Sequence, residues 1–270
     1  MKYNVLGSAL DSGGFGRVYL VEGEDKRRYA MKELKSPNVV NKKRFEREIS
    51  ILRQLNHPNI VKIIEWNTEG NPPIGPWYTM EYLGGGSLRN HMGEIFRDSV
   101  FSRKWTINTM MLPICDALQL AHNSGIYHRD LKPENIMYTS LTRNQIKVTD
   151  WGLGKDLNRE SIALTAVVGG VGGTPGYCAP EQWFALDNVD SRADVFSLGV
   201  IFYEMMTGHR PVSYDNSMRR PQVDSPSKYH STISPDLDDC VLKMIELQPE
   251  SRHQSISELT NCLKSLPDRI

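Results

Sequence analysis

The chain has 270 residues, long enough to bury a sizeable core as one large domain or as two lobes that share a cleft. Its composition is that of an ordinary globular enzyme. The 32 basic and 32 acidic residues give a formal net charge of zero, which argues against nucleic acid or an anionic membrane as a partner.

The N-terminus and the cysteines indicate the compartment. The N-terminal stretch lacks the apolar core of a signal peptide, and the richest apolar run, at 195–206, is too short for a membrane span and includes Glu204. The cysteines, at positions 115, 178, 240 and 262, are far apart and show neither a C-x-x-C pair nor a histidine spacing typical of a metal site or a disulfide framework. These features predict a soluble, cytoplasmic protein.

The first 82 residues have a strand-rich pattern. Strands are predicted at 5–10, 16–23, 27–34 and 77–83, with a glycine turn between the first two. One helix interrupts them at 42–55. Its apolar residues recur at helical spacing and form one face, and the proline of HPNIV ends it; these residues are Phe45, Ile49, Leu52 and Leu55.

Helical periodicity follows the three glycines at 84–86. It is found at 106–125, 194–207, 235–247 and 255–265. The change from strands to helices predicts an α+β chain with two lobes. These are a small β-rich lobe at 1–80 with one main helix, a hinge at 81–84, and a larger, mostly helical lobe at 85–270.

The stretch YHRDLKPENIMYTSLTRNQIKVTDWG, at 127–152, carries the strongest chemical signal. It places the carboxylate of Asp130, the cation of Lys132, the amide of Asn135 and the carboxylate of Asp150 around one predicted hairpin. Such a set fits a base, a phosphate clamp and two metal ligands. As a purely structural alternative, HRD is a turn before a strand and Asp150 a turn former. The four side chains together favour phosphoryl transfer to a hydroxyl.

The run HRDLKPEN followed by DWG resembles the catalytic and metal-binding loops of eukaryotic-type serine/threonine protein kinases, which usually carry DFG. The resemblance implies a bilobal protein-kinase-like fold, ATP, Mg²⁺ or Mn²⁺, and a protein or peptide substrate. Asp130 would accept the proton of the substrate hydroxyl and Lys132 would neutralise charge on the γ-phosphate. Asn135 and Asp150 would bind metal. Lys132 within DLKPEN matches the serine/threonine class.

The segment DSGGFGRVY resembles the family's G-x-G-x-x-G-x-V loop over the ATP phosphates. Glycine is needed there because a side chain would keep backbone N–H groups away from the phosphates. Asp11 replaces the first glycine and brings a carboxylate towards the nucleotide. The nucleotide-binding residues implied for this loop are Leu10, Asp11, Ser12, Gly13, Gly14, Phe15, Gly16 and Val18.

The same resemblance implies a lysine–glutamate pair and an adenine pocket. Lys32 in YAMKEL would hold the α- and β-phosphates, and Glu48 in FEREISIL would fix its position. Taken singly, each could be an ordinary charged surface residue. Met80 would be the gatekeeper, and the backbone of Glu81 and Leu83 would bind adenine. The faces of adenine would pack against Val18, Ala30 and Met137.

Further downstream, GTPGYCAPE resembles the segment that receives peptide substrate. Glu181 of its A-P-E triplet would pair with Arg252, and Asp194 would brace the catalytic loop. These residues favour a protein kinase over a kinase for small metabolites. Trp151, in place of the usual phenylalanine, would fill an apolar pocket beside the helix that carries Glu48.

Arg129, directly before the catalytic aspartate, indicates regulation by phosphorylation. In the family such an arginine often pairs with a phosphate on the activation loop, which a guanidinium binds through two hydrogen bonds. Ser161 and Thr165 are the candidate autophosphorylation sites. A pseudokinase scaffold that binds nucleotide without catalysis is the alternative, and Asp11 and Trp151 are the features in its favour.

Overall fold

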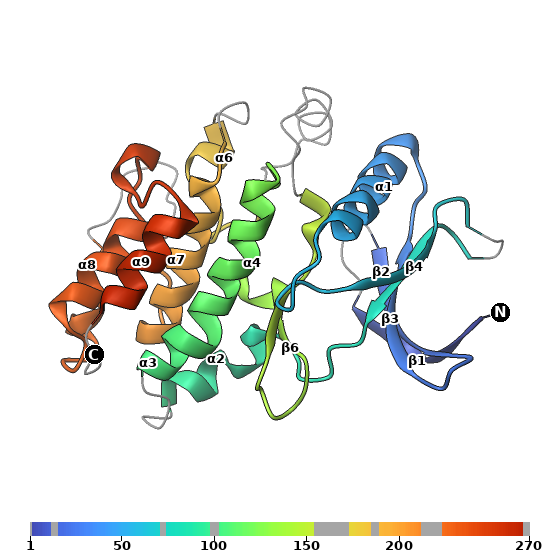
Figure 1. Cartoon of the computed structure of the whole chain (residues 1–270), viewed down its shortest axis with the longest axis horizontal. Helices are drawn as coiled ribbons and strands as arrows, with labels where there is room; N and C mark the ends of the chain where they lie inside the picture. Colours follow the sequence, from blue (N-terminus) through green and yellow to red (C-terminus); the bar gives the residue numbers. More distant parts are fainter. Residues whose placement is uncertain are drawn as a thin grey trace.

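The computed structural model describes residues 2–11, 16–70, 74–97, 103–153, 173–184, 189–211 and 223–266. A β-sheet with one long helix forms one end of the molecule, and a group of packed helices forms the other (Figure 1). The order predicted from the sequence, strands first and helices afterwards, is therefore the order observed.

The N-terminal sheet has five antiparallel strands in the order β1-β2-β3-β5-β4. Its strands are β1 (Tyr3–Asp11), β2 (Gly16–Gly23), β3 (Arg28–Leu34), β4 (Ile63–Asn67) and β5 (Trp77–Glu81). Strand β4 was not predicted from the sequence, because two of its large apolar residues, Ile64 and Trp66, point towards solvent. The guanidinium of Arg53 covers the Trp66 ring at 4.4 Å.

Helix α1 (Val39–Gln54) packs against this sheet. It begins with Asn38, whose side chain accepts a hydrogen bond from the backbone N–H of Asn41 at 2.8 Å. The predicted apolar face is buried, including Phe45 and Ile49. Glu48 lies on the same face with only 4% of its surface exposed, so a carboxylate has been carried into the interior.

The second part of the chain contains one small hairpin and several helices. The hairpin consists of β6 (Ile136–Tyr138) and β7 (Ile146–Val148). The helices are α2 (Leu88–Arg97), α3 (Arg103–Thr106), a π-helical turn (Ile107–Met111), α4 (Leu112–Asn123), α6 (Glu181–Phe184), α7 (Arg192–Thr207), α8 (Pro235–Met244) and α9 (Ile256–Ser265). Short 3₁₀ turns cover Pro133–Asn135, Trp151–Leu153, Pro226–Lys228 and Pro249–Ser251.

The helix predicted at 106–125 is interrupted by its π-helical turn. Pro113 has no backbone N–H and its ring would clash with the carbonyl four residues earlier. The wider π-helical turn at Ile107–Met111 relieves that clash and lets the chain continue as α4.

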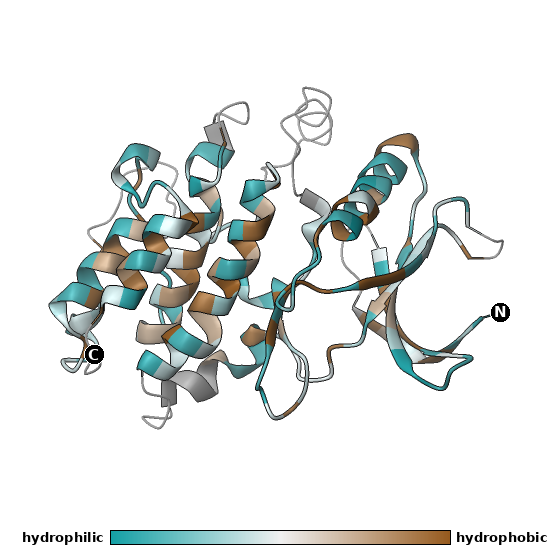
Figure 2. Ribbon diagram, in the orientation of Figure 1, coloured by the Kyte–Doolittle hydropathy of each residue, from teal (hydrophilic) through white to brown (hydrophobic). Residues whose placement is uncertain are grey.

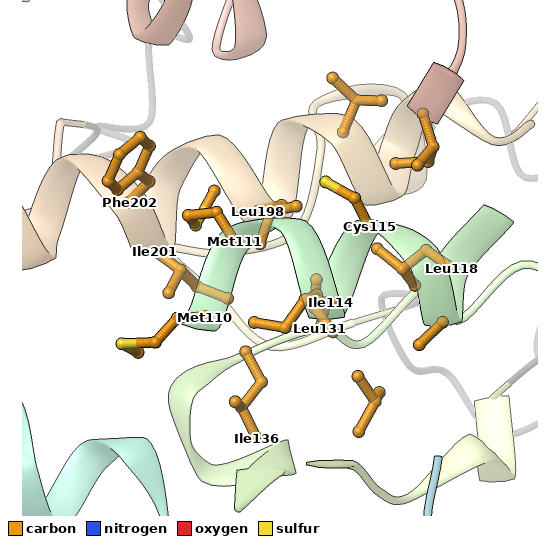
Figure 3. Packing of buried hydrophobic residues seen from close by; sticks show 14 of the residues in the cluster. Met110, Met111, Ile114, Cys115, Leu118, Leu131, Ile136, Leu198, Ile201 and Phe202 are labelled. Atoms are coloured by element: carbon orange, nitrogen blue, oxygen red, sulfur yellow. The ribbon is translucent and has the colours of Figure 1, made fainter. Parts of the chain in front are cut away.

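Helix α7 is the axis of the helical part. All its residues are buried except Arg192 and Glu204, which is typical of a helix in the centre of a core. Hydrophobic residues gather along α4 and α7 (Figure 2). In the close view, Leu198 and Ile201 of α7 lie beside Met110, Ile114 and Leu131 (Figure 3). The apolar run at 195–206 is therefore core, and none of the described helices is long and apolar enough to cross a membrane.

Gly199 sets how closely α7 and α8 approach. A Cβ atom built at Gly199 would lie 2.6 Å from Cβ of Met244 and 2.8 Å from Cγ2 of Ile245. Both neighbours are buried, so neither can move away freely.

We therefore predict that Gly199→Ala lowers the free energy of unfolding by about 1–3 kcal/mol through overpacking. Alanine is a better helix former than glycine, so helix propensity alone would raise stability by up to about 1 kcal/mol. Urea unfolding of both proteins distinguishes the two effects, and a more stable variant would contradict the close contact.

Candidate active site

Three charged side chains from distant segments meet between the sheet and the helical part. The Nζ of Lys32, on β3, lies 2.6 Å from Oε1 of Glu48 on α1 and 3.0 Å from Oδ1 of Asp150, which follows β7. The hydroxyl of Tyr78 on β5 donates a second hydrogen bond to the same Glu48 oxygen at 2.8 Å. The ammonium is therefore held by two carboxylates.

The charges in this cluster stabilise one another. Burial lowers the pKa of Lys32, but the charges of Asp150 and Glu48 outweigh it and hold that pKa well above its usual value. The ammonium of Lys32 in turn lowers the pKa of Asp150 to about 2, so its carboxylate is ionised at neutral pH. Burial raises the pKa of Glu48, although Lys32 opposes that rise.

A strained turn presents Asp150 to this cluster. Its φ angle of 60° lies in the left-handed region, which residues other than glycine rarely adopt. Trp151 anchors the turn from behind: it is fully buried, its Nε1 lies 3.5 Å from the carbonyl oxygen of Val148, and its ring lies 4.8 Å from that of His128. The Asp150 side chain remains 44% exposed and can bind a ligand.

Asp194, at the start of α7, holds the loop before Asp130. Its carboxylate accepts hydrogen bonds from the backbone N–H groups of His128 and Arg129, each at 2.8 Å, and lies 2.7 Å from Nε2 of His122. Burial alone would raise the pKa of Asp194, but the contact with His122 and the other hydrogen bonds lower it overall. The ionised carboxylate fixes Arg129 in its left-handed conformation, with φ of 63°.

Asp130, Lys132 and Thr174 form a second polar group. The Thr174 hydroxyl donates to Oδ1 of Asp130 at 2.7 Å, and the Nζ of Lys132 lies 3.1 Å from Oδ2 of Asp130 and 3.0 Å from the same hydroxyl. The Asn135 amide donates to the Asp130 backbone carbonyl at 2.9 Å. The segment that begins at Thr174 is therefore tied directly to the loop that carries Asp130.

The segment after Thr174 is anchored at its far end by a buried ion pair. Nη1 and Nη2 of Arg252 lie 2.7 and 2.8 Å from the two carboxylate oxygens of Glu181. The Arg252 side chain is completely buried, and it also donates to the backbone carbonyls of Glu246, Leu247 and Arg192. Gln182, which no sequence motif singles out, also ties this segment to the loop before Asp130, because its side chain donates to the carbonyl of Arg129 at 2.7 Å.

Two adjoining cavities open onto these groups. One, of about 720 Å³, is lined by both polar groups: Lys32, Glu48, Asp130, Lys132, Asn135, Asp150 and Thr174. The other, of about 470 Å³, is lined by ten residues of the predicted nucleotide-binding set: Leu10, Gly16, Val18, Ala30, Lys32, Met80, Glu81, Leu83, Met137 and Asp150. Asp11 lies at the end of β1, where it pairs with Val18.

Some predicted residues lie outside the described part of the chain: Ser12, Gly13, Gly14, Phe15, Ser161 and Thr165. Arg129, the expected regulatory partner of Ser161 and Thr165, lies within the described residues. Its Nη2 donates to the carbonyl of Val189, while its Nε is buried and makes no hydrogen bond among the described residues. Burial lowers the pKa of Arg129, and the nearby Asp194 charge opposes that effect.

The structure also shows a network that sequence reasoning missed. Nε of Arg89, on α2, lies 2.9 Å from Glu134, and its Nη1 lies 3.0 Å from Glu204 on α7. Arg89 and Glu204 also contact the Tyr177 hydroxyl, and these residues line the larger cavity. No sequence motif links α2 to α7, so only the fold reveals this group.

A sheet lobe, a helical lobe and a lysine–carboxylate cluster at the cavities between them define a phosphotransferase class of domain. The family model of the protein kinase domain matches residues 4–263, and the chain belongs to that family. The resemblance stated from the sequence is thereby confirmed. Membership implies binding of ATP with a divalent metal ion.

The relatives are bacterial serine/threonine protein kinases. The serine/threonine-protein kinase PknB of Mycobacterium tuberculosis is 34% identical over 266 residues, which cover 94% of this chain and 41% of that protein. A probable serine/threonine-protein kinase of Streptomyces coelicolor is 33% identical over 269 residues, covering 94% and 38%. The chain thus spans about two fifths of the length of these curated relatives.

Solved structures agree with this assignment. The crystal structure of a mutant PknI kinase domain of Mycobacterium tuberculosis superimposes with a TM-score of 0.70 at 25% identity. The match covers 97% of this chain and 94% of that one. The predicted α+β, bilobal kinase fold is therefore confirmed. The exact lobe limits at 80 and 85, and the roles of individual site residues, stay predictions.

The buried Arg252–Glu181 pair yields a stability prediction. Arg252→Ala leaves a largely buried carboxylate without its partner, so we expect the free energy of unfolding to fall by about 3–5 kcal/mol. Lys2→Ala breaks an exposed pair with Glu65 and should cost less than about 1 kcal/mol. Chemical unfolding measures the free energy of unfolding of both variants. Equal losses in the two variants would contradict a larger stabilisation by the buried pair.

Proposed function

We propose that the domain is an active protein kinase that transfers the γ-phosphoryl group of ATP, with Mg²⁺, to serine and threonine hydroxyls of proteins. One observation carries this proposal. Lys32 lies within hydrogen-bond distance of both Glu48 and Asp150, in a cleft that also exposes Asp130. A cation beside an ionised metal-binding carboxylate and a candidate base is what phosphoryl transfer requires.

The smaller cavity supports adenine binding. Its walls include the apolar side chains of Val18, Ala30 and Met137. The Glu81 carboxylate is already engaged, because its Oε1 accepts from the Lys62 backbone N–H at 2.7 Å and lies 2.8 Å from the Lys147 ammonium. Glu81 would therefore bind adenine through its backbone, as would Leu83.

The donor set beside the cavities suits a hard divalent cation. Asp150 and Asn135 both line the two cavities and offer only oxygen ligands, which Mg²⁺ and Mn²⁺ prefer. Since its pKa is held at about 2, Asp150 needs no deprotonation before it binds metal. A bound ion would neutralise negative charge on the β- and γ-phosphates.

Asp130 is placed to handle the proton of the substrate. Thr174 and Lys132 hold its two carboxylate oxygens, which fixes the side chain in one orientation. In that position Asp130 would accept the hydroxyl proton, and Lys132 would balance charge on the transferred group. The larger cavity, with the anchored segment from Thr174 to Glu181 beside it, would receive the peptide.

We predict that Asp130→Asn lowers kcat by about 10²–10⁴-fold, because the neutral amide cannot act as a base although it keeps nearly the same shape. Lys32→Met and Asp150→Ala should abolish turnover with the fold intact. Labelling of generic protein substrates with radioactive ATP measures these effects, with Lys2→Ala as an unaffected surface control. A wild-type domain without magnesium-dependent turnover would favour the pseudokinase scaffold instead.

Regulation by autophosphorylation is a further part of this proposal. The buried Arg129 guanidinium keeps one N–H without a hydrogen bond among the described residues, and a phosphate could satisfy it. We predict that incubation with ATP and magnesium adds phosphate at Ser161 or Thr165, detected by intact mass and peptide mapping. A mass that does not change in an otherwise active domain would contradict this mode of regulation.

A further inference from the structure

Two thiols and an imidazole meet in the helical part of the chain. Cys240 lies on α8, Cys262 on α9, and His253 in the segment between the helices. Their sulfur and nitrogen donor atoms all lie within 4.8 Å of one another. None of the three residues lines either of the cavities described above. The cysteine spacing had given no sign of this cluster, because 21 residues separate Cys240 from Cys262.

The donor atoms share one small space. Sγ of Cys240 lies 2.6 Å from Sγ of Cys262 and 3.9 Å from Nε2 of His253. Cys240 and His253 are buried, and Cys262 is partly exposed. Tetrahedral coordination, with zinc–sulfur distances of about 2.3 Å, would set the two sulfurs roughly 3.8 Å apart. A small rotation of the Cys262 side chain towards solvent would provide that separation.

The surroundings of His253 favour the ligating form of its ring. Its Nδ1 makes no hydrogen bond among the described residues and lies 3.5 Å from Oε1 of Glu258. Glu258 is itself held by Lys243 at 2.7 Å and by the backbone N–H of Gln254 at 2.8 Å. A carboxylate behind the ring stabilises the tautomer with hydrogen on Nδ1, which frees Nε2 to bind a metal. Without metal, Nε2 can donate to the Cys240 carbonyl at 3.2 Å.

We propose that Cys240, His253 and Cys262 bind one thiophilic divalent cation, with Zn²⁺ as the preferred ion. On binding, each thiol releases its proton to solvent, and the two thiolates neutralise the charge of the ion. The neutral imidazole is the third ligand, and a water on the exposed side of Cys262 is the fourth. Sulfur and nitrogen donors separate this site from the oxygen donors beside Asp150, which suit harder ions.

Such an ion would connect α8 and α9 with each other and, through Arg252, with the segment from Thr174 to Glu181. His253 directly follows Arg252, whose guanidinium holds Glu181. A metal bound at His253 would restrict the backbone at Arg252 and thereby stabilise this anchor. Its role is structural and independent of nucleotide binding.

The test uses the full chain, kept reduced, stripped of metal with a chelator and studied without ATP. Co²⁺ is the probe, because thiolate ligation produces a sulfur-to-cobalt absorption band that oxygen sites lack. We expect one equivalent of Co²⁺ to produce this band, an equivalent of Zn²⁺ to remove it, and Zn²⁺ to raise Tm. A titration without the band would overturn the proposal.

Variants locate the site. Cys262→Ser and His253→Ala should each weaken Zn²⁺ binding by roughly tenfold or more. Cys115→Ala, which removes a buried thiol outside the donor set, should leave it unchanged. Circular dichroism shows whether each variant is folded. If His253→Ala does not fold, the Zn²⁺ affinity of Cys262→Ser, a change at a partly exposed position, tests the proposal on its own. Full affinity in Cys262→Ser would overturn the proposal, as would a Cys240–Cys262 disulfide that persists in reducing buffer and excludes metal.

Discussion

One buried ammonium determines how the two parts of the molecule meet. A charge removed from water is costly unless opposite charges and hydrogen bonds compensate it, and Lys32 obtains that compensation from two segments. Glu48 provides it from α1, so the helix must lie against the sheet with a carboxylate on its buried face. Asp150 provides it from the strained turn after β7. The pairing that compensates the buried charge therefore also brings these three side chains together beside the cavities.

A second buried charge organises the helical side in the same way. Asp194 lies in the first turn of α7, the helix around which the core is packed. Its carboxylate accepts hydrogen bonds from the backbone N–H groups of His128 and Arg129. Asp130 follows these residues directly, so its position is set by the core rather than by a flexible loop. The Arg252–Glu181 pair then fixes the segment from Thr174 to Glu181 to the same core. Asp130 and the segment from Thr174 to Glu181 are thus each held in place by a buried charge.

Local patterns predicted the parts of the fold that depend on neighbouring residues. The apolar face of α1 and the all-round apolar character of α7 can be seen in the sequence, as can the HRDLKPEN and DWG motifs. Strand β4 was missed because Trp66 points outward and is covered by Arg53. The Arg89–Glu204 contact and the Cys240–Cys262 contact were missed because they join segments far apart in the chain. Periodicity carries no information about such pairings.

The central claim is that Lys32 and Asp150 serve a single nucleotide. A crystal structure of the domain with magnesium and a non-hydrolysable ATP analogue tests it most directly. The account predicts adenine between Ala30 and Met137, phosphate oxygens on the Lys32 ammonium while Glu48 still holds it, and the metal ion on Asp150. A nucleotide bound elsewhere, or one that contacts Lys32 while Asp150 faces a different cavity, would contradict it.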